Sequence, residues 1–162
     1  MRQIAYLSLG SNLGDREHSL REAISRVETV GRVVSVSSLY ETEPVELADQ
    51  AWFLNCVVML ETKMTPEQLM GALLNIEQSM GRQRVQKKGP RTIDLDILLY
   101  GDAAVDLPEL TIPHPAMHQR RFVLEPLAEI APDARHPVLK KTARELLAGL
   151  PPGQAVRKFK SS

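Results

Sequence analysis

The pattern of hydrophobic and polar positions predicts four β-strands and two helices ahead of residue 100. Runs in which apolar residues alternate with polar ones or follow one another cover residues 4–9, 33–40, 53–61 and 92–99, as strands do. Apolar residues at helical spacing cover residues 16–30 and 66–81, and a glycine stands at or just after the end of each stretch. Thr65 and Gln68 add a capping box at the start of the second helix.

The order of these elements, strand–helix–strand–strand–helix–strand, is typical of the ferredoxin-like βαββαβ sandwich. We therefore predict an α+β fold of this class, with additional C-terminal helices near residues 121–130 and 142–150 that cover one face of the sheet. A loop rich in proline and histidine is expected at residues 108–115, and a frayed tail at residues 158–162. No repeat or linker divides the sequence, so we expect a single domain over residues 1–162.

Composition and charge exclude several classes of protein. The 162 residues are 43% hydrophobic and 25% charged with a formal net charge of zero, which argues against a general nucleic-acid binder. Cys56 is the sole cysteine and lies in an apolar run, so we expect a buried thiol and no intramolecular disulfide. No apolar run reaches membrane-spanning length, and the N-terminus lacks the pattern of a signal peptide. We expect a cytoplasmic monomer that binds neither nucleic acid nor a membrane.

The clearest candidate chemistry is the pair Asp94 and Asp96 on the last predicted strand. Side chains two residues apart on a strand share a face and stand roughly 6–7 Å apart along the chain. Ile93, Leu95 and Ile97 then point to the opposite face, as a core-facing row should. Two carboxylates on one apolar strand repel each other unless a cation lies between them, and Mg²⁺ commonly takes one or two carboxylates together with substrate phosphates.

A basic loop comes directly before this strand. Between Gly81 and Arg91 there are five cationic residues and no acidic one, namely Arg82, Arg84, Lys87, Lys88 and Arg91. An Asp-x-Asp pair alone, or a basic loop alone, is more often a solvated surface than a binding site. Their adjacency changes this balance, because the loop supplies the charge that complements a polyphosphate. The sequence therefore predicts a site for a nucleoside triphosphate with Mg²⁺.

Two other segments look functional. The polar segment 43–51 leads into Trp52 and could form a mobile wall over a pocket. Further on, His114 lies between two prolines and is followed by Arg120 and Phe122, which brings an imidazole, a guanidinium and an aromatic ring close in sequence. A lone histidine beside prolines is more often a turn residue than a ligand, so this segment is the weaker candidate.

Several motifs together resemble the 6-hydroxymethyl-7,8-dihydropterin pyrophosphokinase family. They are GSNLGDR, SSLYETEP, FLN, GRxR, GPRTIDLDILLYG and IPHPxMxxRxFVLxPLxEIAP, of which GPRTIDLDILLYG is the most specific. The resemblance covers essentially the whole chain. It implies a ferredoxin-like α+β fold and transfer of a pyrophosphoryl group from ATP to the hydroxymethyl group of the reduced pterin, with release of AMP. It also implies two Mg²⁺ ions and a role in folate biosynthesis.

The resemblance also implies roles for individual residues. The implied catalytic set is Arg82, Arg91, Asp94 and Asp96, and the two aspartates would hold both Mg²⁺ ions. The residues implied around ATP are Met70, Leu74, Glu77, Arg82, Arg84, Arg91, Ile97, Thr111, His114 and Arg120. The residues implied for the pterin pocket are Thr42, Pro44, Val45, Phe53, Asn55 and Phe122. A flat heterocycle that stacks on an aromatic ring while an amide reads its polar edge makes physical sense for a pterin.

Three positions depart from the pattern of the family. Lys88 stands where many members carry a tryptophan, Pro115 replaces a frequent tyrosine, and Glu109 occupies a place where an arginine can serve the nucleotide. We therefore expect the lid over the pterin and the affinity for the nucleotide to differ, while the metal and pterin sites stay intact.

Two alternative functions remain open on the sequence alone. Polymerase palms and nucleotidyl cyclases also place paired aspartates on a ferredoxin-like sheet, and a non-catalytic ligand-binding module can share the fold. Within the preferred function, the group that accepts the proton of the substrate hydroxyl is either Asp96 or water.

Overall fold

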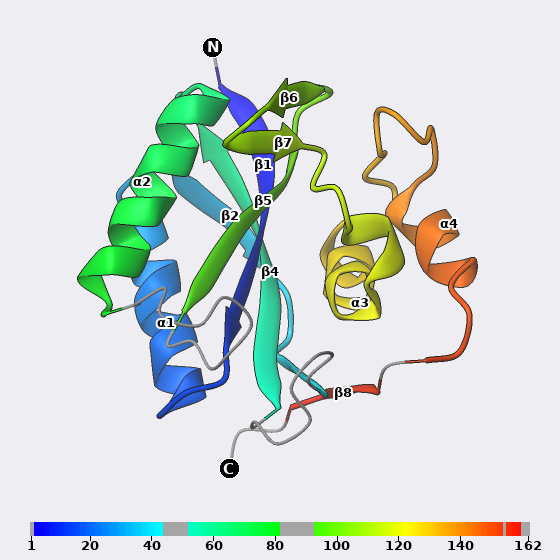
Figure 1. Ribbon diagram of the computed structural model, residues 1–162, viewed down its shortest axis with the longest axis horizontal. Helices are drawn as coiled ribbons and strands as arrows, with labels where there is room; N and C mark the ends of the chain where they lie inside the picture. Colours follow the sequence, from blue (N-terminus) through cyan, green and yellow to red (C-terminus); the bar gives the residue numbers. More distant parts are fainter. Residues whose placement is uncertain (1, 44–51, 82–92, 154, 160–162) are drawn as a thin grey trace.

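The computed structural model describes residues 2–43, 52–81, 93–153 and 155–159 (Figure 1). Its elements are, in chain order, β1 (Gln3–Ser11), α1 (Arg16–Val27), β2 (Arg32–Val36), β3 (Tyr40–Thr42), β4 (Phe53–Thr62), α2 (Pro66–Ser79), β5 (Asp94–Tyr100), β6 (Val105–Leu107), β7 (Leu110–Ile112), the 3-10 helix η1 (Met117–Gln119), α3 (Arg121–Ile130), α4 (Ala143–Ala148) and β8 (Val156–Lys158).

The main sheet has the strand order of a ferredoxin-like fold. Its path is β5-β1-β4-β3-β8, with β2 also paired to β4, and the pairs are antiparallel. Since β2 and β3 occupy successive stretches of the same side of β4, the four core strands follow the order of the split βαβ motif. The predicted α+β class with added C-terminal helices is confirmed.

Two apolar cores lie on the two faces of the sheet, with α1 and α2 on one side and α3 and α4 on the other (Figure 1). The first core joins the helical stripes of α1 and α2 to inward residues of β1 such as Leu7, which is fully buried. Cys56 belongs to this core, and burial raises the pKa of its thiol to about 12. The second core packs Leu124 and Leu127 of α3 against Val57 and Leu98 of the sheet.

Local chemistry fixes the starts of the helices. The carboxylate of Asp15 accepts the backbone N–H of His18 at 3.1 Å and caps α1. Thr65 and Gln68 form the predicted capping box, and Pro66 takes the first position of α2.

Three predictions about elements need correction. The strand expected over residues 33–40 is divided into β2 and β3. At the break the backbone N–H of Ser37 still donates to the carbonyl of Val57 at 2.9 Å, but the N–H of Val57 is accepted by the Ser37 hydroxyl, also at 2.9 Å, and not by a backbone carbonyl. Residues 105–112 form the β6–β7 hairpin, where a loop was expected from residue 108. Residues 156–158 form β8 beside β3, so Lys158, the expected start of a frayed tail, belongs to a strand, and residues 160–162 lie outside the described part of the chain.

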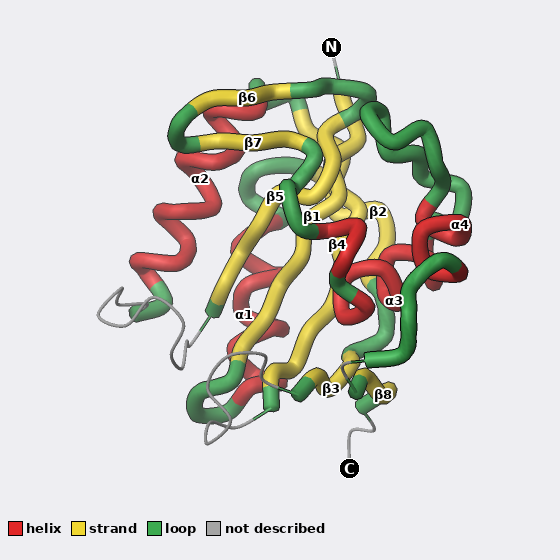
Figure 2. The backbone as a smooth tube through the Cα atoms, turned by 45° about the vertical axis from the view of Figure 1, so that its right-hand side comes forward, coloured by secondary structure: helices red, strands yellow, loops and turns green. Residues whose placement is uncertain are grey.

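The hairpin lies beside α2 and the end of β5 (Figure 2). Leu110 and Ile112 turn their side chains into the first core and attach it there. Within the described residues, none of the helices has the length and hydrophobicity needed to cross a membrane.

Candidate functional site

The register of the sheet gathers the candidate residues on the face that α3 covers. Ile93, Leu95 and Ile97 are buried in the core under α1 and α2, so Asp94 and Asp96 project from the opposite face of β5, as predicted. These two positions stand across from Gly10 and Ser8 of β1 respectively. The carboxylates are therefore neighboured by a glycine and a serine, which leave space above the sheet.

One row of the sheet joins the carboxylates to the predicted pterin pocket. Gly10 pairs with Asp94 on one side and with Asn55 of β4 on the other. A Cβ atom at Gly10 would lie 2.8 Å from Nδ2 of Asn55 and 3.6 Å from Cδ1 of Phe53. Because Gly10 has no side chain, the amide of Asn55 and the ring of Phe53 can lie close to the backbone of β1. Sequence reasoning missed Gly10, although a glycine inside a strand can mark such a close approach.

Two buried polar atoms in this pocket have no hydrogen-bond partner among the described residues. They are Oγ1 of Thr42 and Oδ1 of Asn55, whose residues are only 2% and 4% exposed. An unpaired buried polar group costs about 1–3 kcal/mol, so it calls for an explanation such as a ligand. Thr42 pairs with Phe53 across the β3–β4 ladder, which places an acceptor and a ring side by side. The arrangement suits a planar ligand with a polar edge.

His114 is held beside β5 in a defined tautomer. Its backbone N–H donates to the carbonyl of Leu98 at 3.0 Å, and its Nδ1 accepts the backbone N–H of Ala116 at 3.2 Å. The neutral ring therefore carries its proton on Nε2. Burial and the nearby Arg120 lower the pKa of His114 to about 4, against a smaller opposing effect of Asp94. His114 is thus a neutral hydrogen-bond donor at physiological pH.

Arg120 and Phe122 lie at the start of α3, where the guanidinium carbon of Arg120 is 5.5 Å from the centre of the Phe122 ring. The contact is a cation–π interaction. It brings together one residue of the predicted ATP set and one of the predicted pterin set.

The lowered pKa of His114 predicts how stability depends on pH. The pKa falls from 6.5 to about 4 on folding, so between these values the unfolded chain binds more protons, and stability is lost as the pH falls through this range. Urea unfolding at about pH 5 and about pH 7.5 should therefore show a steeper pH dependence for the wild type than for His114→Gln. Equal slopes in the two proteins would contradict the assignment. Burial and the nearby His118 also lower the pKa of His136, so some pH dependence should remain in the variant.

A second set of predicted residues lies on the other face of β5. Glu77 of α2 is buried, and its Oε2 accepts the backbone N–H of Leu95, between the two aspartates, at 2.7 Å. Met70 packs at the margin of the first core, and Leu74 is 36% exposed. Ile97 is buried in that core. Because β5 ends the path of the main sheet, its outer edge is bordered by α2 on one face and by the aspartates on the other.

The structure thus places Glu77 and Ile97 on one face of β5 and the two aspartates on the other, and the pterin-set residues of β3 and β4 lie along that second face of the sheet. The predicted residues outside the described part of the chain are Pro44, Val45, Arg82, Arg84 and Arg91, together with the departure at Lys88. Thr111 is exposed on β7, and the departures Glu109 and Pro115 are exposed as well.

The aspartate pair fits Mg²⁺ bound together with a polyphosphate. No group of three or more histidine, cysteine, aspartate or glutamate side chains that could hold a metal ion occurs in the described part of the chain. A cage made only of protein ligands is therefore not formed by these residues. Two carboxylates on one strand face, with small neighbours on β1, are the incomplete ligand set that Mg²⁺ completes with phosphate oxygens and water.

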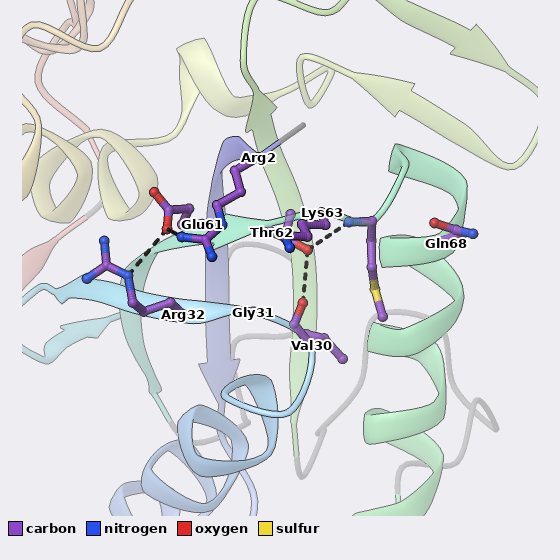
Figure 3. A pocket seen from close by; sticks show the side chains of 9 residues that line it. Arg2, Val30, Gly31, Arg32, Glu61, Thr62, Lys63 and Gln68 are labelled. Atoms are coloured by element: carbon purple, nitrogen blue, oxygen red, sulfur yellow. Dashed lines mark hydrogen bonds and ion pairs between the residues drawn. The ribbon is translucent and has the colours of Figure 1, made fainter.

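A different hollow lies at the opposite end of the sheet, between the start of β2 and the end of β4 (Figure 3). Three of its charged groups already pair, since Glu61 accepts from Arg2 at 3.2 Å and from Arg32 at 3.3 Å. The hydroxyl of Thr62 is likewise bonded, to the carbonyl of Val30. This hollow is therefore separate from the candidate site.

Fold and site together define an α+β protein whose paired aspartates suit a metal-bound polyphosphate and whose neighbouring polar and aromatic side chains suit a planar ligand. The chain belongs to the 7,8-dihydro-6-hydroxymethylpterin-pyrophosphokinase family, whose model matches residues 6–132. The predicted family is confirmed, and the family match supports the predicted pyrophosphokinase activity in folate biosynthesis.

Two bacterial relatives carry the name 2-amino-4-hydroxy-6-hydroxymethyldihydropteridine pyrophosphokinase. The Bacillus subtilis protein is 48% identical over 132 residues, which are 80% of this chain and 79% of that protein. The Pseudomonas aeruginosa protein is 45% identical over 153 residues, which are 93% of this chain and 94% of that protein.

Longer proteins contain a similar segment. The chain is 46% identical to the folic acid synthesis protein fol1 of Schizosaccharomyces pombe over 98% of its own length but spans only 22% of that protein. A crystal structure of wild-type Plasmodium falciparum HPPK-DHPS with pterin and p-hydroxybenzoate superposes with a TM-score of 0.72 at 20% identity, over 91% of this chain and 42% of that chain. This last similarity supports the fold.

Proposed function

We propose that this chain transfers the pyrophosphoryl group of ATP to the hydroxymethyl group of 6-hydroxymethyl-7,8-dihydropterin, with AMP as the second product. The observation that carries the proposal is the row Asp94–Gly10–Asn55, which sets a carboxylate and a polar pocket on either side of a bare glycine. The family match and the names of the bacterial relatives support the same reaction.

In this proposal the pterin occupies the pocket between β3, β4 and the start of α3. Thr42 and Asn55 bond its polar edge with the two atoms that otherwise stay unpaired. Phe53 and Phe122 stack on its rings. Pro44 and Val45 belong to the same proposed pocket. The substrate hydroxyl then points along the row toward Asp94.

ATP is proposed to lie along the outer edge of β5. Met70, Leu74, Ile97 and Thr111 border its base, and Glu77 holds the backbone of β5 between the two aspartates. His114 offers its Nε2–H to a phosphate oxygen and Arg120 adds positive charge. Arg82, Arg84 and Arg91 complete the proposed set around the phosphates.

In the reaction the hydroxyl oxygen of the pterin attacks the β-phosphorus of ATP. The bond from that phosphorus to the oxygen bridging it to the α-phosphorus breaks, and AMP leaves. The hydroxyl proton passes to Asp96 or to water. Two Mg²⁺ ions, held by Asp94 and Asp96 with the phosphates, would neutralise phosphate charge and polarise the hydroxyl. Arg82 and Arg91 would offset charge that develops on the transferred group.

We also propose that the enzyme acts as a cytoplasmic monomer. Both substrates are water-soluble metabolites.

The test is an assay of AMP release with ATP, Mg²⁺ and 6-hydroxymethyl-7,8-dihydropterin, with phosphorus NMR of the products. One AMP and one pterin diphosphate should form per turnover, and chelation of Mg²⁺ by EDTA should stop the reaction. The 6-methyl analogue, which lacks the attacking hydroxyl, should inhibit without reacting. Release of pyrophosphate with a nucleotide product would point to a polymerase- or cyclase-like enzyme, and ligand binding without turnover would point to a non-catalytic module.

A further inference from the structure

The C-terminal strand β8 lies outside the segment that the family model matches and pairs with the strand that carries Thr42. We propose that β8, acting through Arg157, positions the pterin-binding residues of β3 and β4, and that Arg157 is a positioning residue for pterin binding. The inference rests on the proposed function, because it concerns the same pocket.

The pairing of β8 makes β3 an interior strand. Thr42 stands across from Phe53 of β4 on one side and from Val156 of β8 on the other. Both ends of this ladder are extended by further bonds. The N–H of Glu43 donates to the carbonyl of Ala155 at 3.2 Å, and the N–H of Phe159 donates to the carbonyl of Leu39 at 2.8 Å.

Side chains reinforce the pairing on the face of β3 opposite Thr42. Glu41 accepts from Arg16 of α1 at 3.0 Å and from Arg157 of β8 at 3.2 Å. Burial alone would raise the pKa of Glu41, but the hydrogen bonds from Arg16 and then Arg157 hold it below its usual value. The carboxylate therefore stays charged and bridges a helix to the C-terminal strand.

The same two arginines also reach Trp52, the residue before Phe53. The guanidinium carbon of Arg157 lies 4.5 Å from the centre of the Trp52 ring, and Arg16 donates to the Trp52 carbonyl at 2.9 Å. The network thus ties Glu41, next to Thr42, to Trp52, next to Phe53. The network therefore holds Glu41 and Trp52, which lie on either side of residues 44–51 in the sequence.

The consequence follows from the shortness of β3. A strand of three residues paired on one side only would be a weak edge, and the hydroxyl of Thr42 would move with it. Binding is stronger when ligand-contacting groups are held in place beforehand, because less freedom is lost on binding. The described residues proposed for ATP lie on α2, β5 and β7, at His114 and at Arg120, and none of them is on β3 or β8, so loosening β8 should affect the pterin more than ATP.

The experiment compares Arg157→Ala with Arg32→Ala. Arg32 is a matched control, because it also extends from a strand to a carboxylate that two arginines share. Its nitrogen–oxygen distance is 3.3 Å and its side chain is 67% exposed, compared with 3.2 Å and 65% for Arg157. Its carboxylate, Glu61 (Figure 3), lies near the end of β4, whereas Phe53 begins that strand.

For Arg157→Ala we expect the KM for the pterin to rise about five- to tenfold, which corresponds to about 1–1.4 kcal/mol for one exposed ion pair and one cation–π contact. The KM for ATP and kcat should stay within about twofold. All three constants should stay within about twofold in Arg32→Ala. Arg157→Lys, which keeps the charge but loses the planar group, should give an intermediate KM for the pterin.

Trp52 is the sole tryptophan, so its fluorescence reports on the network directly. Its emission should change in Arg157→Ala and not in Arg32→Ala. A fluorescence titration with 6-hydroxymethyl-7,8-dihydropterin also gives a Kd that does not depend on turnover. Wild-type protein that binds the pterin without turnover would refute the proposed function, while the positioning role would still be judged from the Kd values. Equal pterin affinity in the two alanine variants, or a parallel loss of ATP affinity in Arg157→Ala, would overturn the positioning role.

Discussion

Asp94→Asn and Asp96→Asn should each reduce kcat by about 10²- to 10³-fold, the cost of removing one strong electrostatic contact from a transition state. The amide keeps the shape of the carboxylate but loses the charge that the metal ions need. Both variants should stay folded, because Asp94 and Asp96 project from the face of β5 opposite the first core.

The measurement is AMP release at saturating substrates, together with thermal unfolding of each variant. Asp102→Asn is the matched control, because Asp102 is an exposed carboxylate in the turn after β5 and is not part of the proposed site. Its kcat should equal that of the wild type. If either site variant kept more than about a tenth of the wild-type activity, the proposed metal ligands would be wrong.

The part of the site that lies on regular strands could be predicted from the sequence. The alternation in residues 93–97 alone placed Asp94 and Asp96 on one face and the apolar residues on the other, and the burial of Ile93 and Leu95 confirms it. A period of two is a local property of the chain, so it requires no knowledge of which strands pair. In the same way, the order of strands and helices along the sequence was sufficient to predict the ferredoxin-like fold.

Features that depend on distant pairing could not be predicted. The sequence of β8 is three residues long and shows no decisive alternation, and its partner Tyr40–Thr42 is more than a hundred residues away. At the division between β2 and β3, the hydroxyl of Ser37 accepts a backbone N–H of β4. The role of Gly10 becomes visible only when its register with Asn55 is known.

The pocket residues show how binding competes with stability in this protein. Thr42 and Asn55 each bury an oxygen that finds no partner within the described residues, which destabilises the ligand-free protein. Such groups are kept where function requires them, so removing them should stabilise the fold while weakening binding. The replacements Thr42→Val and Asn55→Leu test both effects at once.

Asn55→Leu should lower pterin affinity by about 100-fold and Thr42→Val by about tenfold, since each variant leaves a polar group of the bound ligand unpaired at about 1–3 kcal/mol. Both should raise the free energy of unfolding of the ligand-free protein by about 1 kcal/mol. Urea unfolding and fluorescence titration with the pterin measure the two effects.

Ser11→Ala is the control, because the buried hydroxyl of Ser11 also has no partner among the described residues but belongs to the face that α1 and α2 cover. Ser11→Ala should change stability without changing the affinity for the pterin. If Thr42→Val and Asn55→Leu instead lost stability and kept their affinity, the buried oxygens of Thr42 and Asn55 would serve the fold and not the pterin.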